Sequence, residues 1–106
     1  MMKKTFLVLT LFFSQLAFAK NSTHCGDIER MRVWANGGDK YGVWVEYTAN
    51  PANCPGGFYM KHVSDNKDLV YSFLLSAKTS KQRVCIQTAG TIMNGNRCLL
   101  NYVMDP

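Results

Sequence analysis

Few residues of this chain have the types and spacing that catalysis requires. The two histidines, His24 and His62, stand far apart, and no metalloprotease, nucleophile-elbow or phosphate-loop motif accompanies either one. Most of the seven acidic residues suit turns, helix caps or cross-strand pairs, so a pair of glycosidase carboxylates is not indicated. The sequence therefore predicts a protein that is not an enzyme and has no cofactor.

The four cysteines predict a covalent framework rather than a metal site. Cys25, Cys54, Cys85 and Cys98 are separated by 29, 31 and 13 positions, whereas zinc sites and thioredoxin-like motifs need closely spaced pairs. An even number of cysteines in a small exported chain is typical of disulfides. We expect two disulfides, which four cysteines can connect in three ways.

Residues 28–35 and 41–48 are predicted to form a β-hairpin. The segment Asn36–Asp39, with two glycines between an asparagine and an aspartate, is a strong turn signal. With the turn centred near Asp39, the apolar residues of both strands share one face, and the other face is aromatic and charged.

Trp34 and Trp44 are the residues that packing explains least. In the expected register Trp34 lies opposite Trp44, and Arg32 lies opposite Glu46, on the face away from the apolar residues. Exposed aromatic residues flanked by polar groups suit a surface that binds a glycan or a protein. These four residues are the predicted binding site. The alternative is a tryptophan pair that only stabilises the hairpin.

Residues 1–19 are typical of a secretory signal peptide. Lys3 and Lys4 precede an apolar run, and Ala17-Phe18-Ala19 is a cleavage signal. The run is too short to span a membrane, and no longer apolar run follows. Removing the first 19 of the 106 residues leaves 87, and it lowers the net charge from +5 to +3 because two lysines and no acid are lost. So mild a charge does not indicate nucleic-acid binding, and we expect a periplasmic or secreted protein.

The mature chain, residues 20–106, is predicted to be one domain with the element order β-β-β-α-β-β. Residues 20–27 are a polar leader, and strands are expected at 58–63, 84–88 and 98–104 in addition to the hairpin. A helix is predicted over 67–82 because apolar residues recur along one stripe: Leu69, Val70, Phe73, Leu74 and Ala77. This order fits an OB-like, five-stranded antiparallel barrel with the helix between strands three and four. An open antiparallel sheet with the helix on one face has the same order.

The barrel topology favours one disulfide pairing. Strands three and five of an OB barrel run parallel, so Cys54 and Cys98, at their starts, lie at the same end of neighbouring strands. Cys25 and Cys85 then form the second bridge. The rival pairing joins Cys25 to Cys54 and Cys85 to Cys98.

Three segments resemble the B subunits of subtilase-type cytotoxins. They are the helix-to-strand segment 68–87, the Pro-x-x-Cys-x-Gly-Gly-Phe-Tyr run at 51–59, and Asn-Gly-Asn-Arg-Cys at 94–98. The resemblance implies an OB fold and a pentameric ring that binds cell-surface glycans or a partner protein and delivers a separate catalytic subunit. It places no sugar-contact residue on this chain. The alternative function is a small monomeric envelope protein, such as an inhibitor or an immunity factor.

Overall fold

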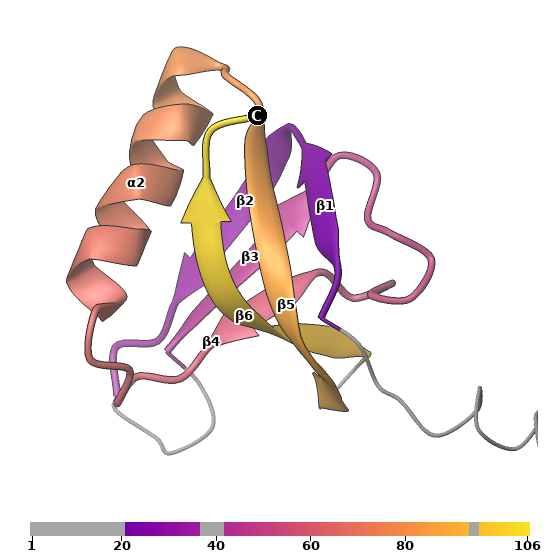
Figure 1. The fold of residues 1–106 in the computed structure, drawn as a ribbon. Coiled ribbons are helices and arrows are strands. Elements are labelled where there is room, and N and C mark those ends of the chain that lie inside the picture. The colour runs from indigo at the N-terminus through magenta and orange to yellow at the C-terminus, as the bar shows by residue number, and fades with distance from the viewer. Residues whose placement is uncertain (1–20, 37–41, 94–95) are drawn as a thin grey trace, which may run out of the picture.

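Six strands and one helix make up the described part of the chain, residues 21–36, 42–93 and 96–106 of a computed structural model (Figure 1). The strands form one mixed sheet in the order β1-β5-β6-β4-β3-β2. The pair β4 and β6 is parallel, and the other neighbouring pairs are antiparallel. The elements are β1 (Thr23–Gly26), β2 (Ile28–Val33), β3 (Val43–Tyr47), β4 (Phe58–Met60), α2 (Lys67–Ser80), β5 (Val84–Met93) and β6 (Arg97–Met104).

The strand β1 was not predicted. It lies within residues 20–27, which were expected to be a polar leader. Its partner in the sheet is β5. The two edge strands of the sheet, β1 and β2, are separated in the chain by Asp27 alone. Because one residue spans only about 3.5 Å, the sheet must coil until its two edges approach each other at Asp27. No ladder joins those edges, so the sheet is not a closed five-stranded barrel.

Three predicted element bounds also change. The strand β4 ends at Met60 rather than at Val63, because the chain turns there and Ser64 N–H donates to Lys61 O at 3.1 Å. The strand β5 continues to Met93 instead of ending at residue 88. The helix α2 ends at Ser80 because Lys81 takes a left-handed conformation, with φ of 57°.

The hairpin of β2 and β3 has the expected faces but a different register. Met31 lies opposite Val45 and Arg32 lies opposite Trp44, which is a shift of two residues from the prediction. Because side chains alternate with a period of two, this shift leaves every side chain on its predicted face. A bulge between Ile28 and Arg30 alters the register again at the start of β2.

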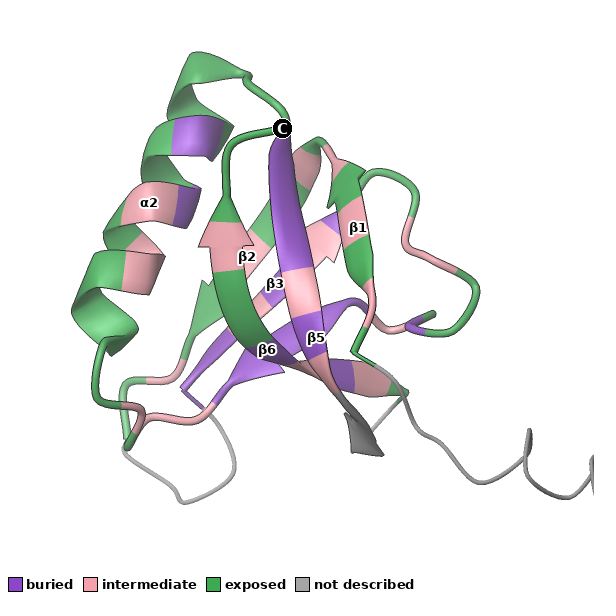
Figure 2. Cartoon of the chain, viewed as in Figure 1, coloured by how far each residue is buried: buried purple, intermediate pink, exposed green. Residues whose placement is uncertain are grey.

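The core lies between one face of the sheet and α2. Figure 2 shows buried positions of α2 on the side that faces the strands, and these include Leu74 and Ala77. Val70 and Phe73 pack against this core as predicted. Leu69 was expected in the same stripe, but it is 71% exposed, so that assignment is wrong.

Tyr47, on β3, connects this strand to β1 and β5 inside the core. Its side chain is 3% exposed, and its hydroxyl lies 2.7 Å from His24 O of β1 and 3.1 Å from Val84 O of β5. A Cβ at Gly26 would lie 2.8 Å from the Tyr47 ring, so only a glycine fits there without displacement. Burial raises the pKa of Tyr47 above its usual range.

Two disulfides cross the fold, Cys25–Cys85 and Cys54–Cys98. They are the two pairs that the barrel topology favoured. Cys25 and Cys85 lie directly opposite each other on β1 and β5. Cys54 precedes β4 and Cys98 lies on β6, which runs parallel to β4.

Two disulfides are compatible with a periplasmic or extracellular protein. The predicted signal peptide, residues 1–19, lies outside the described residues. Within residues 21–36, 42–93 and 96–106, no helix is long and apolar enough to cross a membrane.

Candidate functional site

Three of the four predicted site residues come together on the outer face of the hairpin, away from α2. The ring centroids of Trp34 and Trp44 are 4.4 Å apart, although the two residues are diagonal rather than direct neighbours. The guanidinium carbon of Arg32 lies 5.7 Å from the Trp34 ring centroid and 5.2 Å from that of Trp44. Both distances are within the range of a cation–π interaction.

Glu46, the fourth predicted residue, does not pair with Arg32. The register shift places Glu46 opposite Arg30, and the Arg30 Nη1 to Glu46 Oε2 distance is 3.6 Å. An exposed ion pair of this kind contributes less than ~1 kcal/mol. Its main consequence is that Glu46 balances the charge of Arg30 and leaves Arg32 with the indoles.

Sequence reasoning missed Arg97. Its guanidinium carbon lies 3.2 Å from the Trp44 ring centroid. Arg97 begins β6, which reaches the hairpin only through β4: Trp44 pairs with Tyr59, and Tyr59 pairs with Leu99. Nothing near Arg97 in the sequence indicates this contact, because it depends on the parallel pairing of distant strands.

Arg32, Trp34, Trp44 and Arg97 together are called the Trp–Arg surface below. Arg32 is exposed, whereas Trp34, Trp44 and Arg97 are half-buried. Two guanidinium groups already lie against the Trp44 ring, which leaves less indole surface for a sugar ring to stack on. The surface therefore presents cationic hydrogen-bond donors supported by aromatic rings.

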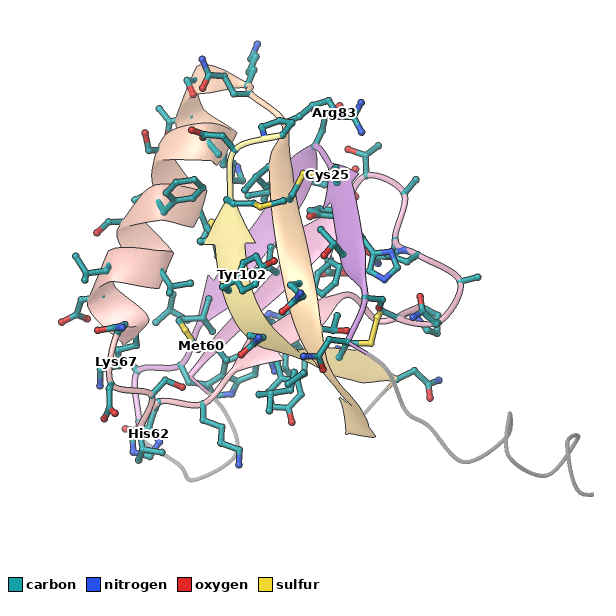
Figure 3. All side chains as sticks on the ribbon, in the orientation of Figure 1. Cys25, Met60, His62, Lys67, Arg83 and Tyr102 are labelled. Atoms are coloured by element: carbon teal, nitrogen blue, oxygen red, sulfur yellow. A yellow bond between two sulfur atoms is a disulfide. The ribbon has the colours of Figure 1, made fainter. Side chains whose placement is uncertain are left out.

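A groove of about 300 Å³ adjoins this surface at Trp34. It lies where the end of β2, the start of β3 and the segment after β4 meet the first turns of α2, and its lining includes Val33, Val43 and Tyr71. Figure 3 shows His62 and Lys67 close together at this end of the molecule, where Lys67 Nζ donates to His62 O at 2.7 Å.

The polar residues of the groove are predominantly basic. Among the described residues, Lys61, His62 and Lys67 line it together with one carboxylate, that of Asp68. His62 Nδ1 is buried and has no hydrogen-bond partner within the described part of the chain. The groove thus combines apolar walls with basic groups.

A serine–histidine contact lies elsewhere, at the start of β1. Ser22 Oγ is 2.9 Å from His24 Nε2 and 3.1 Å from Thr88 Oγ1. Ser22 N–H and C=O also meet Thr88, so these bonds anchor the beginning of β1 to β5. Among the described residues, no group of three or more His, Cys, Asp or Glu side chains could hold a metal ion.

No protein-family model matches the chain, and neither a curated protein nor a solved structure matches it.

Proposed function

We propose that this chain is an exported, non-enzymatic binding module that recognises a partner protein through the Trp–Arg surface. A periplasmic or secreted inhibitor is one form that such a module takes. The observation that carries the proposal is the cluster of two tryptophans and two arginines on an outer sheet face.

The composition of this surface favours a protein partner over a neutral glycan. Tryptophan and arginine are the residues most enriched among those that dominate the binding energy of protein interfaces. Val33 is 54% exposed and lines the groove that adjoins Trp34, where it adds an apolar contact of the kind that a partner protein covers. A neutral sugar, in contrast, would need open indole faces, and arginines occupy part of these.

Two further features belong to the same proposal. Residues 1–19 direct export and are removed, which agrees with the presence of two disulfides. The fold is of the OB type, with β1 and β2 acting as one strand that bends at Asp27 and pairs with β5 before the bend and β3 after it. The parallel pair of β4 and β6 supports this assignment, since the same pair was expected from an OB topology.

Capture of the partner tests the function. The mature chain, immobilised, is exposed to an envelope extract of the cells that make it, and bound proteins are identified by mass spectrometry. We expect a specific protein that the wild type retains and that Trp34→Ala and Trp44→Ala lose. Leu69→Ala is the matched control, because it removes an exposed apolar side chain from α2, outside the Trp–Arg surface.

Circular dichroism and disulfide mapping establish that each variant is folded, and Trp34→Phe replaces Trp34→Ala if the latter unfolds. A glycan array is probed in parallel with the same variants. Binding of an uncharged glycan that depends on both tryptophans would contradict the choice of a protein partner. Light scattering after size-exclusion chromatography shows whether the module is a monomer or a ring such as a pentamer.

A further inference from the structure

We propose that the partner presents an acidic segment with an apolar side chain: a carboxylate binds Arg32, and the apolar side chain enters the groove beside Trp34. This inference rests on the proposed function and specifies the chemistry of the partner. Two independent observations carry it, the unused donors of Arg32 and the apolar walls of the groove.

Arg32 is arranged as a receptor for an oxyanion. The guanidinium carbon lies 5.7 Å from the Trp34 ring centroid and 5.2 Å from that of Trp44, so cation–π attraction holds the group beside both indoles without using its N–H donors. Within the described chain, Arg32 makes no hydrogen bond or ion pair, since Glu46 pairs with Arg30 instead. A planar fork of donors held in this way matches a carboxylate.

The groove offers a place for an apolar side chain next to that carboxylate. Val33, Val43 and Tyr71 form apolar parts of its wall, and its volume of about 300 Å³ is larger than one aromatic side chain. Trp34 belongs both to the Trp–Arg surface and to the groove wall, so one short segment can reach both.

The charge around the groove indicates which residues should flank the apolar side chain of the partner segment. Lys61 and Lys67 border the groove, and Asp68 supplies its only carboxylate among the described lining residues. The whole chain carries a net charge of +5, of which residues 1–19 contribute two units. Acidic residues on both sides of the apolar side chain therefore complement this end of the molecule.

Synthetic peptides provide the test. The probe is a peptide of about seven residues with one phenylalanine between acidic residues, and two reference peptides replace either the acids by lysine or the phenylalanine by serine. The chain has two tryptophans, Trp34 and Trp44, so its intrinsic fluorescence reports on this surface alone. We expect the acidic peptide to change the fluorescence and both reference peptides to bind much more weakly.

Variants assign the contacts. Arg32→Gln is expected to weaken binding of the acidic peptide on the order of ten- to one-hundred-fold, which is the loss of one charge-assisted hydrogen-bonded pair. Lys78→Gln, which removes an exposed cation from the last turn of α2, is the matched control and should leave binding unchanged. Val33→Ser should weaken binding of the phenylalanine peptide and leave the weak binding of the serine peptide unchanged.

The inference is overturned if the acidic peptide does not bind, or if Arg32→Gln and the wild type bind it equally. Binding of a sulfated oligosaccharide in place of the peptide, also dependent on Arg32, would likewise overturn it. The proposed function is tested separately, by capture of the natural partner. If Arg32→Gln still captures the natural partner while Trp34→Ala does not, the binding module stands and only its acidic partner is wrong.

Discussion

The hydroxyl group of Tyr47 provides the most direct test of how the strands are held together. Tyr47→Phe removes one oxygen and leaves the ring in place against Gly26. It also leaves the carbonyl oxygens of His24 and Val84 without this donor in a site that is almost closed to water. Loss of a buried hydrogen bond of this kind costs about 1–2 kcal/mol. For a domain of this size, that lowers Tm by roughly 5–15 °C.

Urea denaturation followed by tryptophan fluorescence measures this change in the free energy of unfolding. Tyr102→Phe is the matched control, because Tyr102 is 40% exposed, and it should change stability by less than ~0.5 kcal/mol. A Tyr47→Phe variant as stable as the control would refute the conclusion that the hydroxyl joins β1 and β5.

The pKa of the same tyrosine gives the stability a defined pH dependence. Burial, the largest cause, raises the pKa of Tyr47 above its usual value of 10.0. Above about pH 10 the unfolded chain therefore releases this proton while the folded chain keeps it, and stability falls by up to ~1.4 kcal/mol per pH unit. Below pH 10 the contribution is complete. The Tyr47→Phe variant should show a shallower alkaline decline, and an identical decline would contradict this assignment.

Three further outcomes are expected. Gly42→Ala should destabilise the fold by more than ~2 kcal/mol, because its Cβ would lie 2.5 Å from the backbone nitrogen of His62; urea denaturation measures it, and a neutral result would reject the close approach. A mild thiol reductant should open the disulfide at Cys25, which is exposed, before the one at Cys54, which is buried, as read by alkylation and peptide mass; the opposite order would count against the fold. The intact mass of the exported protein should correspond to an N-terminus at Lys20, and a product that retains residues 1–19 would contradict export.

The hairpin of β2 and β3 shows which structural features local sequence patterns can predict. Alternation of apolar and polar residues correctly assigned the faces of β2 and β3, because a face depends only on the parity of the register. The register itself was wrong by two residues, a shift that preserves parity. Cross-strand pair preferences do not distinguish the two registers. In the observed register Trp34 and Trp44 are still in contact, along the diagonal, and Glu46 forms its ion pair with Arg30 instead of Arg32.

Longer-range features were harder to predict. The strand β1 has no alternating apolar pattern, and it exists because β5 pairs with it and Cys25 is linked to Cys85. The contact of Arg97 with Trp44 depends on three neighbouring strands. The disulfide pairs, in contrast, were predicted correctly, because an OB topology places Cys54 and Cys98 at the same end of neighbouring parallel strands and leaves Cys25 to Cys85.

The two disulfides also constrain the order in which the molecule can be completed. They interleave along the chain: the bridge from Cys25 to Cys85 begins before that from Cys54 to Cys98 and also ends before it. A chain that emerges from its N-terminus exposes Cys25 and Cys54 long before their partners. If an oxidant joined these two thiols at once, the product would hold a non-native bridge that must later be exchanged. Correct assembly therefore requires that oxidation wait until almost the entire chain has emerged, or that an isomerase correct the first bridge.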